Sequence, residues 1–233
     1  MGMVEILLSL LFFFSSIIWW LLLCIFGAPF LIIGVVGRQF LGFVYSQFHG
    51  RFLRIIFPTN HSLEKNYIKR GEKLLDLGCG NGFWALEISE KFGANVFLTD
   101  IADTNMTKLP FSLFDGSKAD FPDKSFDIVL LNFVLHHTPN PILILKEAIR
   151  LSRGKIIIYE DNASGVVPKL STTMHGIIFN IVNHINNKAT FHSFSEWKKI
   201  FISLHLRILF AKTNWKIDSL TYPVKQCFFV LNT

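Results

Sequence analysis

The chain has 233 residues, which is long enough for one α/β domain with something to spare. It is 51% hydrophobic and only 17% charged, and the hydrophobic excess lies at the N-terminus, so a membrane segment is joined to an ordinary globular part. The net charge of +6 is diffuse, which favours an anionic membrane surface, and we expect no nucleic-acid partner. Cys24, Cys79 and Cys227 have neither metal-ligand nor disulfide spacing, so we expect no metal site and a reduced, cytosol-facing globular part.

Residues 1–37 are predicted to insert into a membrane. Residues 6–36 carry no charged side chain, and a helix over 6–26 would cross a hydrocarbon layer of about 30 Å at about 1.5 Å per residue. A cleaved signal peptide fits poorly, because Glu5 precedes the run, no Lys or Arg does, and no clear cleavage site follows. Pro29 interrupts the run and leaves two geometries open, one long kinked span or a span followed by a short re-entrant turn.

Residues 38–58 are predicted to form an amphipathic helix in the membrane interface, ended by Pro58. Apolar side chains recur at helical spacing from Phe40 onward, with Arg51 on their flank. Packing of this helix on the globular domain is the alternative that the pattern leaves open. Because basic residues follow the apolar segment and only Glu5 precedes it, the positive-inside rule places the globular part on the cytoplasmic side.

Residues 59–233 are predicted to form one α/β domain. Strand-like apolar runs alternate with helical patterns, which is typical of a parallel sheet with helices packed on it. The chain is expected to end in a hairpin of two strands. Strands are expected at 73–77, 95–99, 111–114, 126–133, 155–159, 207–212 and 224–231, and helices at 61–70, 83–91, 139–151 and, after a capping box at Ser193 and Glu196, to about residue 203.

A glycine-rich turn follows the strand at 73–77. Gly78, Gly80 and Gly82 stand at alternate positions, and Asp76 lies two residues before the first of them. Glycine permits positive φ and close approach of a ligand, and the N–H groups at the start of the following helix face that ligand. The turn predicts a site for a nucleotide-like ligand, although its spacing is not the G-x-G-x-x-G of dinucleotide sites. A tight turn without a ligand is the plain alternative.

Acidic residues also follow the next two strands. Asp100 ends the second strand, about twenty residues past the turn, where a carboxylate can hold a pair of ribose hydroxyls. Asp115 follows the third strand. Since ligands of α/β sheets bind over the carboxyl ends of the strands, we expect Asp76, Asp100 and Asp115 to border one site.

Three stretches of the chain resemble a known family. LDLGCGNG at 75–82 is similar to the first motif of class I S-adenosylmethionine-dependent methyltransferases. FPDKSFDIV at 121–129 is similar to a stretch of their ubiquinone/menaquinone C-methyltransferase-like branch, also called methyltransferase type 11. VLHH at 134–137, followed by LKEAIR at 145–150, extends the resemblance, which covers about residues 63–161. The combination is specific for the superfamily and weak for the substrate.

The resemblance implies a Rossmann-like, doubly wound, seven-stranded methyltransferase sheet, mostly parallel with the last strand antiparallel, preceded by the N-terminal hydrophobic and amphipathic helices. It implies S-adenosyl-L-methionine as cofactor. Asp76 would line its methionine part, Asp100 would hold its ribose hydroxyls and Asp115 would lie at its adenine edge. Asn132 and Phe133 would face the sulfonium. The cofactor-binding residues that the resemblance implies are Asp76, Gly78, Cys79, Gly80, Gly82, Asp100, Ile101, Asp115, Gly116, Asn132 and Phe133.

The sequence departs from the family pattern in two places. The connection from Asp100 to Asp115 is short, so the third helix is expected to be cut to a turn or two. The turn before the fifth strand is also short, at 152–154. Neither departure removes a cofactor contact that the resemblance implies.

The sulfonium already makes the methyl group electrophilic, so the protein mainly holds a nucleophile in line and excludes water. A base is needed only where the nucleophile carries a proton of high pKa. His136 and His137 are the predicted catalytic residues, with a packing role at a helix entry as the alternative. Residues 162–192 are the least regular part, with an apolar helical patch at 177–185, and are interpreted as a substrate-side insertion or lid. Further candidate bases are Tyr159, Asp161, His175 and His184.

These features predict a membrane-anchored methyltransferase that acts on a lipid-soluble small molecule such as a quinone, an isoprenoid or a phospholipid, with membrane lipids as partners. One alternative is a protein or soluble metabolite as acceptor, with the anchor serving only location. Another is an assembly factor with this fold and no turnover, although the intact set of acidic residues and glycines argues against it. The sequence gives no oligomeric state.

Overall fold

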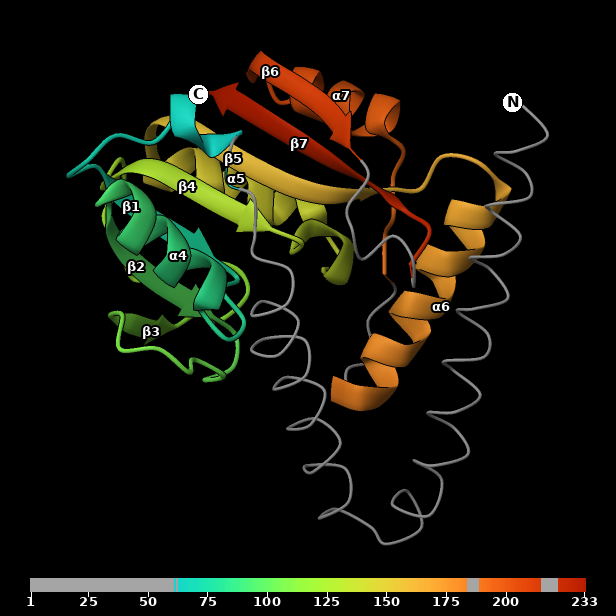
Figure 1. Cartoon of the computed structure of the whole chain (residues 1–233), viewed down its shortest axis with the longest axis horizontal. Coiled ribbons are helices and arrows are strands. Elements are labelled where there is room, and N and C mark those ends of the chain that lie inside the picture. Colours follow the sequence, from blue (N-terminus) through green and yellow to red (C-terminus); the bar gives the residue numbers. More distant parts are fainter. Residues whose placement is uncertain (1–60, 62, 184–188, 215–221) are drawn as a thin grey trace, which may run out of the picture.

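The computed structural model describes residues 61, 63–183, 189–214 and 222–233 (Figure 1). The predicted membrane segment at 1–37 and the predicted interfacial helix at 38–58 lie outside these residues. Among the helices that the structure does describe, none combines the length and the apolar character that a membrane crossing needs.

The described strands form one seven-stranded sheet in the order β3-β2-β1-β4-β5-β7-β6 (Figure 1). Neighbouring strands from β3 to β5 are parallel, whereas β7 is antiparallel to both β5 and β6. The predicted Rossmann-like sheet with an antiparallel last strand is therefore confirmed. The strands are β1 (Lys73–Leu77), β2 (Asn95–Asp100), β3 (Phe111–Leu113), β4 (Phe126–Asn132), β5 (Ser152–Asn162), β6 (Arg207–Asn214) and β7 (Lys225–Asn232).

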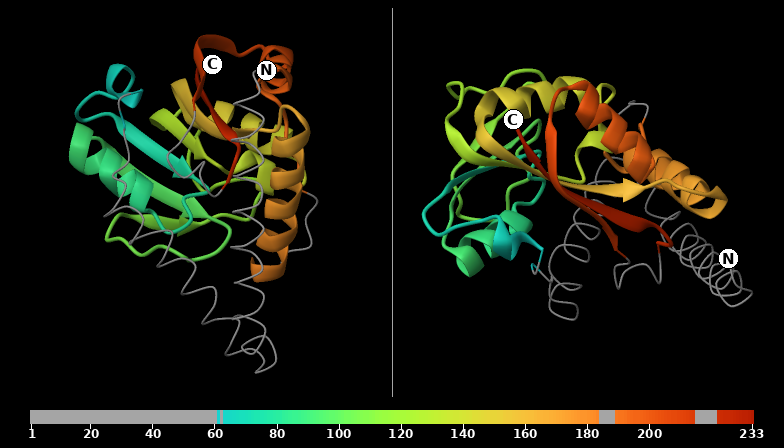
Figure 2. Two further views of the ribbon diagram at one scale, coloured as in Figure 1. Left: turned by 45° about the vertical axis from the view of Figure 1, so that its right-hand side comes forward. Right: turned by 90° about the horizontal axis from the view of Figure 1, so that it is seen from above.

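Helices cover both faces of the sheet (Figure 2). α5 and α7 pack on one face around Leu75 and Trp197, and α4 packs on the other around Leu74 and Ile88. Successive residues of β1 thus point into opposite cores, as the alternation of side chains along a strand requires. The helices are α4 (Phe83–Phe92), α5 (Pro141–Leu151), α6 (Val166–Asn183) and α7 (Phe194–Ser203), with 3-10 turns η2 (Glu64–Asn66) and η3 (Leu135–His137).

Local signals in the sequence set the ends of these helices. The Asn140 side chain caps α5, and Pro141 occupies its first turn, where a missing N–H costs nothing. The predicted capping box at the start of α7 is confirmed, because Ser193 and Glu196 each accept a hydrogen bond from the other's backbone N–H. Gly93 ends α4 in the left-handed conformation.

Three expectations about helices differ from the structure. Residues 162–192, predicted to be irregular apart from an apolar helical patch at 177–185, contain the long helix α6 (Val166–Asn183), which begins well before that patch. The helix predicted over 61–70 is, in its described residues, reduced to the turn η2. Residues 101–110 form a loop in place of the expected helical turn or two between β2 and β3. Figure 1 shows that α6 stands beyond the carboxyl ends of β4 and β5, the edge where ligands of such sheets bind.

Candidate active site at the carboxyl ends of the strands

The glycine turn after β1 needs its glycines for two different reasons. Gly78, Gly80 and Gly82 all have positive φ, of 85°, 53° and 76°. A Cβ on Gly78 would lie 2.6 Å from Cγ2 of Val134, and one on Gly82 would lie 2.8 Å from Cδ1 of Leu98, so these two allow close packing. A Cβ on Gly80 would meet nothing within 4 Å. The turn therefore leaves open space at its central glycine.

Asp100, at the end of β2, ties the turn to the second strand. One carboxylate oxygen accepts a hydrogen bond from the N–H of Gly80 at 2.7 Å, and the other accepts from the N–H of Ile101 at 2.7 Å. Burial raises the pKa of Asp100, against the opposing effect of these backbone donors. Each carboxylate oxygen has a second lone pair, so Asp100 keeps acceptor capacity for a ligand.

Asp76 is a buried carboxyl whose Oδ1 has no hydrogen-bond partner in the described part of the chain. Burial, and next the nearby charge of Asp100, raise the pKa of Asp76 from its ordinary value of 3.8 to about 8. Buried polar atoms are nearly always paired in proteins. An unpaired acceptor at this depth suits a cationic hydrogen-bond donor on a ligand.

Cys79 lies within the turn as a half-buried thiol. Burial, followed by the charges of Asp76 and Asp100, raises the pKa of Cys79 well above its ordinary value. The thiolate is the reactive form of cysteine, so this side chain is held in its unreactive state.

Ile101 and Gly116 approach each other at the edge of the same site. Ile101 is 57% exposed, and a Cβ on Gly116, whose φ is +84°, would lie 3.7 Å from its Cγ2. The neighbouring Asp115 is exposed and uses one carboxylate oxygen to accept hydrogen bonds from Ser117 and from the N–H of Lys118. These bonds lower the pKa of Asp115 and commit that oxygen to its own loop.

Asn132 and Phe133 lie where β4 ends. The Oδ1 of Asn132 is buried and has no hydrogen-bond partner among the described residues. Phe133 has a φ of +58°, which is uncommon for a residue other than glycine, and its N–H donates to the carbonyl of Tyr159 at 3.0 Å. Such backbone outliers cluster at functional sites, and this one turns the chain sharply at the carboxyl edge of the sheet.

His136 and His137 follow in the turn η3. His136 is buried, and its Nδ1 is hydrogen-bonded to Oε2 of Glu160, the buried residue near the end of β5. Burial lowers the pKa of His136, but the charge and hydrogen bond of Glu160 outweigh it and raise the pKa above its ordinary value. Burial, and next His136 and His175, lower the pKa of His137, which keeps this imidazole neutral.

The other candidate bases lie in different surroundings. Tyr159 is buried, and burial together with Glu64 raises the pKa of its phenol, so it is a packing residue and a poor base. Asp161 accepts a hydrogen bond from the hydroxyl of Tyr222 at 2.6 Å. His184 lies outside the described residues. His175 of α6 packs edge-on against His136, with ring centroids 5.8 Å apart.

Two features of the site were not predicted from the sequence. Glu160 lies just past the strand expected at 155–159, and its contact with His136 depends on β4 and β5 being neighbours. The approach of His175 to the η3 histidines depends on the part of α6 that precedes the helical patch expected at 177–185.

A family model described as a methyltransferase domain matches residues 49–220 of the chain. The demethylmenaquinone methyltransferase of Staphylococcus aureus is 26% identical over 144 residues, covering 56% of this chain and 59% of that protein. The chain therefore spans little more than half the length of the curated relatives it matches.

Solved structures share the fold. A S-adenosylmethionine-dependent methyltransferase from Methanosarcina mazei superposes with a TM-score of 0.59 at 19% identity, covering 75% of this chain and 98% of that one. The PH0226 protein from Pyrococcus horikoshii superposes with a TM-score of 0.59 at 18% identity, covering 81% of this chain and 94% of that one. At these identities the likeness shows the fold alone.

Proposed function

Because this chain belongs to the methyltransferase domain family, we propose that it is a membrane-anchored S-adenosylmethionine-dependent methyltransferase acting on a lipid-soluble small molecule. The observation that carries the proposal is the unpaired, buried carboxyl oxygen of Asp76 next to Asp100 and the open glycine turn. A chain that had lost its cofactor would have no reason to keep an acceptor buried at this position.

The residues of the site fit S-adenosylmethionine group by group. Its ammonium can donate to Oδ1 of Asp76, and its two ribose hydroxyls can donate to the remaining lone pairs of Asp100. The open space at Gly80 lets the backbone approach the ligand. The exposed side chain of Ile101 beside Gly116 offers an apolar surface to the adenine ring.

The cofactor, when bound, supplies an electrophilic methyl group. The chain's own residues then have to hold the acceptor in line, keep water out and take up a proton where the acceptor carries one. His137 is neutral and stacks on Phe179 with ring centroids 3.6 Å apart, so it offers a lone pair in apolar surroundings. His136, whose pKa Glu160 raises, is the stronger base of the two predicted residues, and His137, whose pKa is lowered, is the second candidate.

The lipid-soluble acceptor, a quinone, isoprenoid or phospholipid, has two lines of support. The uncharged run at 6–36 has the length and composition of a membrane segment, which would bring the site close to lipid. The Staphylococcus aureus relative is named for a quinone substrate. We accordingly propose that the protein lies at the membrane with its catalytic domain on the cytoplasmic side and membrane lipids as partners.

The test has two steps. Titration calorimetry on the detergent-solubilised full chain should show binding of S-adenosylmethionine, and lack of binding would overturn the proposal. Membranes that contain the protein are then incubated with cofactor tritiated in its methyl group and separated into lipid and protein fractions. We expect label in the lipid fraction and none with Asp100→Ala, because the ribose hydroxyls lose their acceptor. Label in the protein or aqueous fraction would instead establish a different acceptor.

A further inference from the structure

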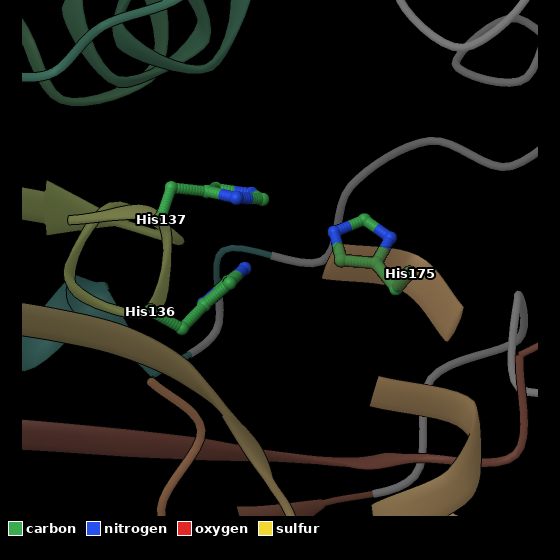
Figure 3. Close-up of side chains that lie close together, drawn as sticks. All are labelled: His136, His137 and His175. Atoms are coloured by element: carbon green, nitrogen blue, oxygen red, sulfur yellow. The ribbon is translucent and has the colours of Figure 1, made fainter. Parts of the chain in front are cut away.

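Three histidines converge beyond the carboxyl end of β4 (Figure 3). His136 and His137 come from η3, and His175 comes from α6, which is distant in the sequence. A ring nitrogen of each histidine lies within 4.8 Å of a ring nitrogen of the other two. The fold therefore gathers three imidazoles whose separation in the chain gives no metal-ligand spacing.

Glu160 sets the orientation of the first of these rings. Its Oε2 is hydrogen-bonded to Nδ1 of His136, and its Oε1 accepts from the N–H of Leu135 at 2.7 Å. We assign the proton to Nδ1, which leaves the lone pair on Nε2 of His136. This Nε2 is buried and has no hydrogen-bond partner in the described part of the chain. Metal-bound histidines in proteins show this arrangement, with one nitrogen held by a carboxylate and the other on the metal.

His137 offers a second lone pair. Its Nδ1 is buried and also lacks a hydrogen-bond partner among the described residues. The rings of His136 and His137 lie 4.0 Å apart between centroids, and both are flanked by aromatic rings, Phe191 beside the first and Phe179 beside the second. Two buried ring nitrogens without hydrogen-bond partners in the described part of the chain are costly unless something binds them.

Packing of α6 holds the third histidine opposite the other two. Gly176 follows His175, and a Cβ there would lie 2.8 Å from Cβ of Ala189 and 3.2 Å from the ring of Phe191. The N–H of Thr190, in the same segment, donates to the carbonyl of His136 at 3.0 Å. The close approach at Gly176 and the hydrogen bond at Thr190 thus fix α6 and η3 relative to each other.

The donor set selects the metal. Magnesium and calcium prefer oxygen ligands, whereas three imidazoles suit zinc and its neighbours in the first transition row. Nitrogens that share a tetrahedral zinc at about 2.0–2.1 Å lie roughly 3.4 Å apart, so binding would draw these nitrogens, now within 4.8 Å of one another, together by at most about 1.4 Å. Side-chain rotation covers that distance. Three protein ligands also leave a fourth position open for water or substrate, as in catalytic zinc sites.

We propose that His136, His137 and His175 bind one divalent transition-metal ion of the zinc class, with Glu160 as a positioning residue. The open coordination position can take an oxygen of the methyl acceptor. A bound ion would then activate the acceptor in place of a free imidazole base. This last role rests on the proposed function, whereas binding of the ion does not.

Metal binding is tested on the untagged, full-length chain in detergent micelles, after treatment with a chelator and without cofactor or acceptor. The probes are Zn²⁺ alone, by competition titration, and Co²⁺ alone, by its visible absorption. We expect one ion per chain and the intense absorption of four-coordinate Co²⁺. His175→Gln, which keeps the bulk of the side chain, should weaken Zn²⁺ binding at least 100-fold, and Glu160→Gln should weaken it by about 10–100-fold.

His205→Asn is the matched control, since it removes an exposed imidazole distant in the sequence from the cluster and should bind Zn²⁺ as the natural chain does. Zn²⁺ should raise the melting temperature of the natural chain and of the control. His175→Gln should also melt cooperatively, which shows that it is folded, but Zn²⁺ should not raise its melting temperature, because the variant lacks the site. Equal Zn²⁺ affinity of His175→Gln and the natural chain, or less than one ion per chain, would overturn the proposal. Either result leaves the assay of methyl transfer unaffected, so the two proposals fail separately.

Discussion

At the scale of a single residue, burial of Asp76 has two opposing effects, one on stability and one on ligand binding. Its buried carboxyl is costly to ionise, as the raised pKa of about 8 shows. The same burial strengthens its attraction for a cationic ligand. We therefore expect the residue to lower the stability of the ligand-free protein in exchange for binding, a balance that is common at functional sites.

Replacing Asp76 by Asn should stabilise the ligand-free protein, and more so at higher pH. Between the ordinary pKa of 3.8 and the folded pKa of about 8, the folded state holds a proton that the unfolded state has released, so stability falls as pH rises. Asn removes this loss, and we expect a melting temperature about 5 °C higher at pH 8 and a smaller gain at pH 5. Scanning calorimetry at both pH values measures the effect, and a gain that does not grow with pH would contradict it.

Asp127→Asn is a control for which we expect the opposite change in melting temperature. The N–H of Lys73 donates to this carboxylate and, with the hydrogen bond and charge of Arg153, lowers the pKa of Asp127. Its stabilisation is present above the ordinary pKa and is lost as pH falls through the lowered one. Asp127→Asn should therefore lower the melting temperature at neutral pH, where Asp76→Asn raises it.

Comparison with Gly71 separates the proposed ligand contact of Gly80 from the energetic cost of its backbone conformation. Both have positive φ, +53° and +82°, and a Cβ on either would meet nothing within 4 Å. Ala at each position should lower the free energy of unfolding by about 1–2 kcal/mol, the cost of left-handed backbone. Only the alanine side chain at position 80 would enter the proposed site, so Gly80→Ala should also weaken S-adenosylmethionine binding at least 10-fold. Urea denaturation measures the stability of both variants, and calorimetry measures their affinity for the cofactor. Equal affinities of the two variants would show that Gly80 has no such contact.

At the scale of elements, Arg150 of α5 explains much of the FPDKSFD and LKEAIR resemblance. Its guanidinium joins α5 to the loop before β4. It donates to both oxygens of the buried Glu147, to the carbonyls of Ala119 and Phe121 and to the carboxylate of Asp123. Oε1 of Glu147 in turn accepts from the N–H of Ala119. These motif residues hold the loop on the helix.

Arg150→Met should be strongly destabilising, because it leaves the carboxylate of Glu147 buried without its cation. We expect a loss of about 3–4 kcal/mol in the free energy of unfolding by chemical denaturation. Arg153→Met is the matched control. Arg153 pairs with Asp127 at 3.0 Å, but the Arg153 side chain is 51% exposed and that of Asp127 31%, so its loss should cost at most about 1 kcal/mol. Similar costs for the two variants would argue against the network.

The strands were predictable because each signal is local. Buried apolar runs between glycine, proline and acidic residues located β1, β2, β4 and β7 to within a residue or two. β5 begins at Ser152, so the turn expected at 152–154 is part of the strand, and it extends to Asn162 because β7 pairs with it through Lys225. The apolar helical patch expected at 177–185 indicated only the end of α6, and its earlier turns were missed because polar residues such as Thr172 and Thr173 interrupt the apolar pattern.

The residues of the candidate site also differ in whether a local sequence signal predicts them. Asp76, the glycine turn and Asp100 were predictable, because they lie next to strand ends whose position a parallel sheet dictates. The cluster of His136, Glu160 and His175 was not, because its members come from separate elements. His136 was chosen for its chemistry alone, and its partners follow only from the placement of β5 and α6.

At the scale of the whole molecule, the chain joins an apolar N-terminal sequence to a domain whose site opens at one edge of its sheet. A soluble acceptor would reach that site from water. A lipid-soluble acceptor would be concentrated in the bilayer, so an enzyme anchored there meets it at a far higher effective concentration. The anchor would therefore affect encounter with the acceptor, and the cofactor site would be independent of it.

Deleting residues 1–37 separates these two effects. The shortened chain should bind S-adenosylmethionine within about 3-fold of the full chain by calorimetry, because the cofactor residues all lie beyond residue 75. Its methylation of an acceptor held in vesicles should fall by about 100-fold, because encounter is no longer confined to the membrane. An unrelated membrane-spanning helix in place of 1–37 should restore methylation, which distinguishes location from contact with the acceptor. If the shortened chain methylates its acceptor in detergent-free buffer as fast as the full chain does, the acceptor is not a membrane lipid and the proposed function has to be revised towards a protein or soluble metabolite.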